Sequence, residues 1–101
     1  MKITGIRIRK ILNNDRPMKA FLSITFDDQF VIHDVKIVYA NGRLLVVMPG
    51  KQMPDGSFRD VAHPLNQEFR TEMEEAVLAA YREALESGLD LVDGGSSSFE
   101  V

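Results

Sequence analysis

Alternating apolar and polar positions predict β-strands in the first half of the chain. Isoleucine and arginine alternate over residues 6–9, and apolar side chains occupy every second position from Met18 to Phe26. The segment from Phe30 to Tyr39 is rich in β-branched and aromatic residues. Leu44 to Met48 is a continuous apolar run, which predicts a strand covered on both faces. With a short strand from Phe58 to Ala62, we expect about five antiparallel strands.

Three turn signals separate these strands. Asp27-Asp28-Gln29 predicts a short hairpin turn, and Asn41-Gly42 predicts a type I′ turn, because that turn needs a positive φ at both central residues. Pro54-Asp55-Gly56 predicts a tight turn that returns the chain into the last strand. The stretch from Met48 to Leu65 holds every proline except Pro17, and it divides the sheet-forming half from the helical half.

Helical periodicity begins after this stretch. Asn66 is a good N-cap, and Glu68 lies in the positively polarised first turn. The apolar stripe of the helix comprises Phe69, Met73, Ala76, Val77, Ala80, Tyr81, Ala84 and Leu85. The opposite face carries Glu72, Glu75, Arg82, Glu83 and Glu86. Gly88 occupies the C′ position, and residues 89–101 form an acidic Ser/Gly-rich tail that we expect to be flexible.

These elements predict a single α+β domain over residues 1–88, with an antiparallel sheet followed by one C-terminal amphipathic helix. Apolar residues make up 45% of the chain and charged residues 27%, which is typical of globular domains. The chain has no cysteine, so disulfides and thiolate sites are excluded and a cytoplasmic location is expected. No apolar run approaches the roughly 18–20 residues of a membrane helix, so we expect no membrane partner.

Charge is distributed unevenly along the chain. Residues 1–64 carry ten Lys/Arg and six Asp, whereas residues 65–101 carry two Arg and nine Asp/Glu, and the total net charge is −3. A chain of this kind can present a basic face although it is acidic overall. Arg7 and Arg9 in the first strand fit an edge strand protected by charge, which is the simpler interpretation, or part of a polyanion-binding surface.

Patterns typical of enzymes are absent from the sequence. His33 and His63 each lie near an aspartate, Asp34 and Asp60, but their spacing matches no known metal-binding motif, and no serine lies in a G-x-S-x-G motif. His63 before Pro64 favours a capping or hydrogen-bonding role. We therefore expect no enzyme, metal, cofactor or small-molecule substrate. A metal-dependent enzyme that uses the two histidines is the weakest alternative.

Basic side chains around the turn-rich stretch are the remaining signal. Lys51 lies in the loop, Arg59 in the returning strand and Arg43 in the Asn-Gly hairpin. Cations that project from one edge of a sheet can hold phosphates. From its residues alone, the chain is predicted to be a small binding module, with nucleic acid as one class of ligand.

A longer order of motifs extends over most of the chain. It includes M-P-G-K at residues 48–51, P-D-G at 54–56 and F-R-D-V-A-H-P-L-N at 58–66. This order resembles the stage V sporulation protein G (SpoVG) family over roughly residues 1–85. The resemblance implies an α+β domain that forms a homodimer through its sheet. It also implies a bacterial regulator, linked to sporulation and septation, that binds DNA site-specifically and also binds RNA.

The resemblance also suggests binding residues. A Lys-Arg pair after M-P-x is associated with nucleic-acid binding in the family; here Lys51 matches, and Gln52 stands where arginine is usual. The predicted nucleic-acid-binding residues are Lys51, Gln52, Arg59, Arg7, Arg9 and Arg70. The alternative function is a protein-interaction module that uses the acidic helix face and does not bind nucleic acid directly.

Overall fold

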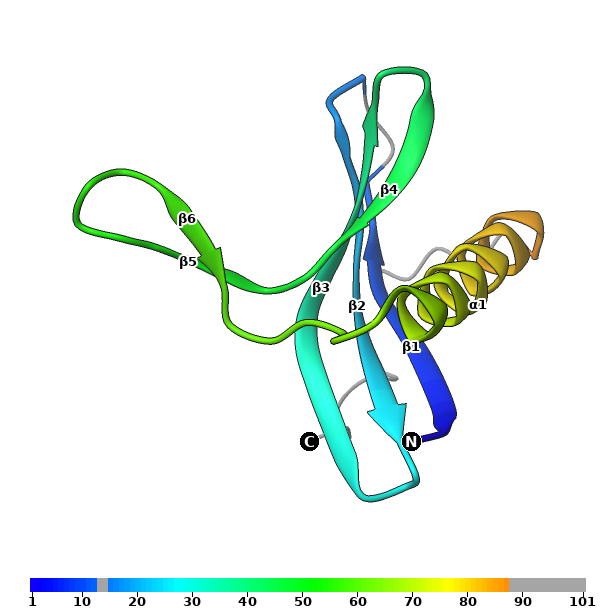
Figure 1. Cartoon of the computed structure of the whole chain (residues 1–101). Helices are drawn as coiled ribbons and strands as arrows, with labels where there is room; N and C mark the ends of the chain where they lie inside the picture. The colour runs from blue at the N-terminus through cyan, green and yellow to red at the C-terminus, as the bar shows by residue number, and fades with distance from the viewer. Residues whose placement is uncertain (13–14, 88–101) are drawn as a thin grey trace.

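The computed structural model describes residues 1–12 and 15–87, and these residues form six strands and one helix (Figure 1). In chain order the elements are β1 (Ile3–Ile11), β2 (Met18–Phe26), β3 (Phe30–Ala40), β4 (Arg43–Val47), β5 (Gly50–Gln52), β6 (Phe58–Asp60) and α1 (Gln67–Glu86). Gly88 and the predicted tail over residues 89–101 lie outside the described residues.

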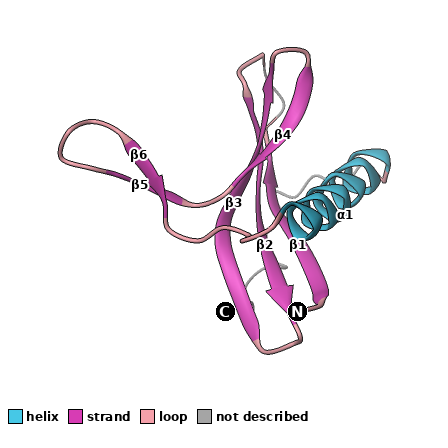
Figure 2. Cartoon of the chain, viewed as in Figure 1, coloured by secondary structure: helices cyan, strands magenta, loops and turns pink. Residues whose placement is uncertain are grey.

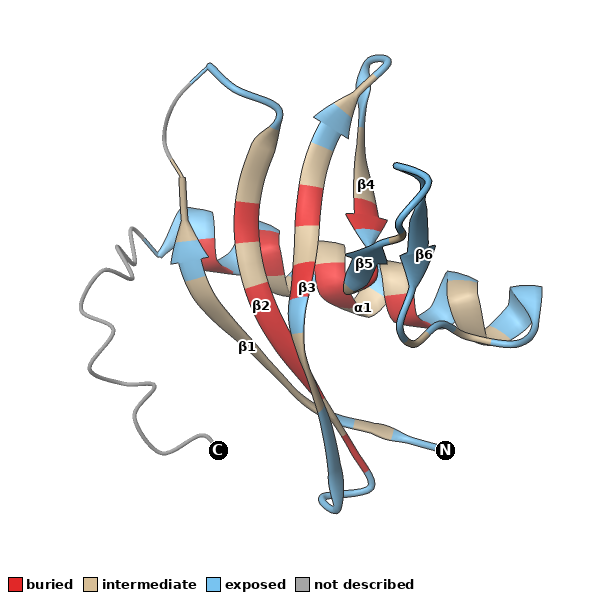
Figure 3. Cartoon of the chain, turned by 90° about the vertical axis from the view of Figure 1, so that its left-hand side faces the viewer, coloured by how far each residue is buried: buried red, intermediate tan, exposed pale blue. Residues whose placement is uncertain are grey.

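The elements form two layers and one projection. Strands β1 to β4 make an antiparallel sheet in the order β1-β2-β3-β4, and α1 lies across one face of it (Figure 2). Strands β5 and β6 pair with each other in a separate two-stranded sheet. We call residues 50–60 the arm, and we call the face of the four-stranded sheet that α1 does not cover the open face. The arm projects on the side of the open face (Figures 1 and 3).

The predicted α+β class, with antiparallel strands followed by one helix, is confirmed. The returning strand pairs with β5 and does not join the main sheet. The chain leaves that sheet at Met48-Pro49, where proline has no N–H to continue a ladder. At the base of the arm, the Val61 N–H donates to the Pro49 carbonyl oxygen at 2.8 Å.

The prediction that the apolar run from Leu44 to Met48 is covered on both faces is wrong for the described chain. Strand β4 is an edge strand that pairs with β3 alone. Val46 and Met48 are buried, but Val47 is 37% exposed. One side of the run therefore faces the core, and the other lies on the open face.

Strand β1 is the other edge, as expected from its charged residues. Its pairing with β2 shifts register between Ile3 and Gly5 and again between Ile8 and Lys10, and each shift adds one residue to β1. The two bulges keep the isoleucines of β1 on the face that α1 covers. Their partners there are the buried β2 residues, in the pairs Ile3–Phe26, Ile6–Ile24, Ile8–Leu22 and Ile11–Ala20.

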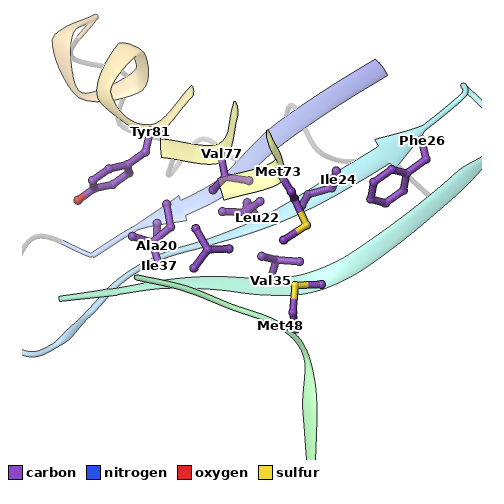
Figure 4. Packing of buried hydrophobic residues seen from close by; sticks show 11 residues of the cluster. Ala20, Leu22, Ile24, Phe26, Val35, Ile37, Met48, Met73, Val77 and Tyr81 are labelled. Carbon is purple, nitrogen blue, oxygen red and sulfur yellow. The ribbon is translucent and has the colours of Figure 1, made fainter. Parts of the chain in front are cut away.

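The hydrophobic core lies between this face and α1. Figure 4 shows Met73, Val77 and Tyr81 of the helix directed toward the side chains of β2 and β3. The strand residues Ala20, Leu22, Ile24, Val35 and Ile37 have no exposed surface. Burial also raises the pKa of the Tyr81 hydroxyl above its usual value. The predicted stripe is correct except at its end, where Leu85 is 49% exposed.

Local signals placed the turns and the helix start correctly. Asp27 and Asp28 have positive φ in the β2–β3 turn. Asn41 and Gly42 both have positive φ, as a type I′ turn requires. The N-cap is also confirmed, because the Phe69 N–H donates to the Asn66 side-chain oxygen at 2.7 Å.

Candidate nucleic-acid interface

The arm brings two of the predicted binding residues together. In the β5–β6 register, Lys51 is directly opposite Arg59, and Gln52 is opposite Phe58. Cross-strand partners share a face of a hairpin, and successive residues alternate between faces. Lys51 and Arg59 therefore lie on one face of the arm, and Gln52 lies on the other. The pair concentrates positive potential on this face. Two like charges directly opposite each other also lower the stability of the hairpin.

Turn chemistry shapes the arm. The Met53 N–H donates to the Ser57 carbonyl oxygen at 2.7 Å, and Gly56, which has a φ of 91°, closes the turn. The Asp55 carboxylate accepts hydrogen bonds from the Ser57 hydroxyl at 2.6 Å and from the Ser57 N–H at 2.9 Å. These two hydrogen bonds, of which the one from the hydroxyl has the larger effect, hold the pKa of Asp55 below its usual value.

The arm is exposed, and its two cations are available to bind a ligand. Every residue of β5 and β6 is exposed. Neither Lys51 nor Arg59 makes a hydrogen bond or ion pair through its side chain with another described residue. A phosphate oxygen could therefore bind both side chains without displacing a partner within the described chain.

The open face, beside the arm, carries more cations than anions. The strand registers place Arg7, Lys10, Lys36 and Arg43 on this face, whereas Arg9 and Lys19 are extra residues at register shifts. The one acidic residue in these strands is Asp34. Helix α1 carries six glutamates and two arginines on the other side of the sheet. The two sides of the molecule are therefore opposite in charge, and the arm stands on the basic side.

The other predicted residues are distributed over both sides. Arg7 pairs with Ser23, which places it on the open face, and Arg9 is the extra residue of the second β1 bulge. Arg70 lies in the first turn of α1, on the acidic side. The structure thus brings Lys51 and Arg59 together, places Arg7 on the same side as the arm, and separates Arg70 from them.

One buried polar pair was not predicted from the sequence. Ser23 is 2% exposed, and its Oγ is hydrogen-bonded to His33 Nδ1 at 2.8 Å. The β2–β3 register shifts here, and Asp34 has a φ of 64°. The signal was the break in the apolar pattern of β3 at His33-Asp34, which marks a bulge. The pair satisfies a buried hydroxyl.

Other candidate chemistry is sparse. Nδ1 of His63 donates to the Pro64 carbonyl oxygen at 3.0 Å, which confirms the hydrogen-bonding role of this histidine. Within residues 1–12 and 15–87, no three His, Asp or Glu side chains come together as metal ligands. A cavity of about 480 Å³ opens at the N-terminal end of α1. Its lining is mainly apolar and includes Phe26, Phe30, Ile32, Met48, Phe69 and Met73.

Comparison with known proteins identifies the family. The SpoVG family model matches residues 1–83. The "Putative septation protein SpoVG" of Oceanobacillus iheyensis is 43% identical over 97 residues, which cover 96% of this chain and 100% of that protein. The protein of the same name from Staphylococcus saprophyticus is 51% identical over 83 residues, which cover 82% of this chain and 81% of that protein.

A third relative, from Macrococcus caseolyticus and also called "Putative septation protein SpoVG", is 47% identical over 102 aligned positions, with 99% of this chain and 88% of that protein covered. In the described part of this chain, α1 is too polar to qualify as a membrane-spanning helix. The match over residues 1–83, together with these identities, shows that the chain belongs to the SpoVG family.

Proposed function

We propose that this protein is a homodimeric, cytoplasmic regulator in a bacterium. It binds DNA and RNA through the arm and the basic side of the sheet, and it has no catalytic activity. The relatives are named septation proteins, so the processes it serves are septation and sporulation. The observation that carries the proposal is the Lys51–Arg59 pair on the exposed strands of the arm.

Charge placement explains how a net-acidic chain can bind a polyanion. Phosphate contacts from lysine and arginine supply most of the sequence-independent affinity for nucleic acid. The arm, with Lys51 and Arg59, lies on the same side of the sheet as Arg7 and Lys10 of β1, and α1, with its glutamates, lies on the other side. A polyanion on the basic side therefore contacts the cations without contacting the acidic helix.

One edge of the four-stranded sheet is better suited than the other to pair with a second copy of the chain. Strand β1 contains two bulges, which disturb pairing with a further strand. Strand β4 pairs with β3 without a register shift, so its outer edge is regular. Antiparallel pairing of two β4 strands about a two-fold axis would join two sheets with both open faces on the same side. The dimer would then offer two arms to one nucleic acid.

The test of nucleic-acid binding is equilibrium titration with random-sequence DNA and RNA over a series of salt concentrations. We expect Lys51→Ala to lower affinity for every sequence and to reduce the salt slope by about one. Arg82→Ala, which removes an exposed cation from the acidic side, is the matched control. An unchanged slope removes Lys51 from the contacts. A wild-type protein that binds neither polymer at low salt refutes the function.

The test of the dimer is light scattering on two valine variants. Val47 and Val31 are each 37% exposed, but Val47 lies on the β4 edge and Val31 lies on β3. We expect Val47→Lys to convert the dimer to a monomer, because two added charges meet across the edge, and Val31→Lys to leave the mass unchanged. A dimer that persists in both variants refutes pairing through β4.

The second candidate function is a protein-interaction module, favoured by the exposed glutamates of α1 such as Glu72 and Glu75. In this case a protein partner would bind the acidic face. A pull-down that nuclease treatment leaves intact and that a Glu72→Gln/Glu75→Gln variant loses would support it. The same variant is expected to keep its affinity for nucleic acid if the first proposal is correct.

A further inference from the structure

An aromatic ring lies between two lysines on the open face. Phe21 of β2 pairs with Lys10 of β1 on one side and with Lys36 of β3 on the other. Antiparallel partners share a face of the sheet, so the three side chains form one row across three strands. Neighbouring strands are about 5 Å apart, which places the two lysine backbones about 10 Å apart with the ring between them.

The ring is on the uncovered side. Its neighbours in the chain, Ala20 and Leu22, are completely buried under α1, and alternation along the strand directs Phe21 to the opposite face. Phe21 is only partly buried there. Neither Lys10 nor Lys36 makes a hydrogen bond or ion pair through its side chain with another described residue.

We propose that the open face binds single-stranded nucleic acid, with a base stacked on Phe21 and the flanking phosphates held by Lys10 and Lys36. This inference rests on the proposed function and names the class of strand that the sheet accepts. Aromatic side chains stack on the faces of unpaired bases, and basic side chains follow the backbone beside them. In a duplex the base faces are covered by neighbouring base pairs, and unstacking them costs free energy, so stacking on the ring favours a single strand.

A second copy of the chain fits this face less well. A two-fold interface is self-complementary, because the same patch occurs on both partners. Two open faces packed together would bring Lys10, Lys36 and Arg7 toward the same cations of the partner, and like charges across an interface are costly. Asp34, in the β3 bulge, is the one acidic residue of the four strands. The charge of the face is therefore complementary to a polyanion.

The experiment uses a fluorescein-labelled oligo(dT) strand and the same strand annealed to oligo(dA). We expect Phe21→Leu to lower affinity for oligo(dT) about tenfold, because stacking is lost, and to leave duplex affinity unchanged. Phe21→Tyr retains a ring and is expected to bind as the wild type does. Lys36→Gln is expected to reduce the salt slope for the single strand by about 0.7, and Arg82→Gln, on the acidic side, to change nothing.

A direct measurement avoids dependence on the folding of variants. In the wild-type protein, oligo(dT) is expected to move the NMR signals of the Phe21 ring protons upfield, because a stacked base shields them. Unmoved ring signals in a saturated complex refute the inference. An equal loss of single-strand and duplex affinity in Phe21→Leu also refutes it. A halved mass of that variant in light scattering refutes it as well, because it would assign the open face to a contact between two copies of the chain.

The outcomes also separate this inference from the proposed function. Wild-type protein that binds neither oligo(dT) nor the duplex refutes both. Suppose instead that the wild-type protein binds both, that Lys51→Ala lowers its affinity for both, and that Phe21→Leu leaves its affinity for oligo(dT) unchanged. This result keeps the arm as the binding site and refutes only stacking on the open face.

Discussion

The four-stranded sheet and the arm are both antiparallel, but they are held by different forces. In the sheet, one face is buried against α1, and residues such as Leu22 and Ile24 have no exposed surface. In the arm, every strand residue is exposed, and Phe58 is 74% exposed. Apolar burial therefore stabilises the sheet, whereas the arm depends on its turn and on a few backbone hydrogen bonds.

This difference separates stability from binding. A side chain in the core is constrained by packing on all sides, so its replacement changes the free energy of unfolding. A side chain on the arm has few neighbours, so its replacement changes mainly what the arm can contact. The residues that we assign to phosphate binding, Lys51 and Arg59, lie in the second category.

The largest expected effect comes from a cavity in the sheet. Leu22→Ala is expected to lower the free energy of unfolding by about 2–5 kcal/mol, because Leu22 is completely buried between β2 and α1. Phe58→Ala on the arm is expected to cost less than about 0.5 kcal/mol. Urea denaturation followed by circular dichroism measures both. Equal losses of stability would contradict the conclusion that apolar burial stabilises the sheet but not the arm. They would indicate that the Phe58 side chain is packed against another protein surface in solution.

A smaller effect distinguishes two turn glycines. Gly42 and Gly56 both have positive φ, and a Cβ at either position would meet no atom within 4 Å. Alanine therefore adds only backbone strain, on the order of 1 kcal/mol. In Gly42→Ala we expect this loss in global unfolding, because the turn joins β3 to β4.

In Gly56→Ala we expect faster amide exchange at Met53, whose N–H donates across the arm turn, and an unchanged free energy of unfolding. A global loss in Gly56→Ala would mean that the arm unfolds together with the sheet.

A comparable effect is expected at the junction between the arm and the helix. Asn66→Ala removes the hydrogen bond to the Phe69 N–H and is expected to cost about 1 kcal/mol of stability. Affinity for nucleic acid is expected to stay constant, because the cap supports the core-facing helix and not the arm. Asn66→Ser, which can still accept the bond, is the control. Lost affinity in a folded Asn66→Ala protein would link the helix start to binding.

The smallest effect is a pH dependence confined to the arm. The pKa of Asp55 is lowered in the folded turn, so the carboxylate stabilises the turn above its ordinary pKa of 3.8 and this contribution is lost as pH falls through the lowered value. The Ser57 amide signal in an NMR titration is expected to move below pH 3.8, and Asp55→Asn to abolish that movement. A midpoint above 3.8 would contradict the assignment.

Local chemistry made part of this fold predictable. Asn41-Gly42, Pro54-Asp55-Gly56 and Asn66 each act within a few residues, so the turns and the helix start could be identified without knowledge of distant partners. The Lys-Gln segment and Arg59 were also nominated from the sequence. The sequence predicts Lys51 in a loop, whereas it lies in β5, and its pairing with Arg59 depends on the register of the arm.

Features that depend on pairing between strands were not predicted. The bulges of β1 leave only a trace, which is the uneven spacing of Ile3, Ile6, Ile8 and Ile11. The separation of the arm from the main sheet and the row around Phe21 need the register of strands that are distant in sequence. For the same reason the apolar run predicts a covered strand at β4, since such a run does not reveal which of its two sides is left open.

The opposite charges of the two sides have a consequence for the reach of the electric field. At physiological ionic strength, electrostatic interactions decay over a Debye length of about 8 Å. Helix α1 is itself about 10–12 Å across with its side chains, and the sheet lies between the helix and the open face. A phosphate at the arm is therefore largely shielded from the glutamates on the outer face of α1. The net charge of −3 describes how the protein migrates in an electric field, but it does not describe what a polyanion encounters at the arm.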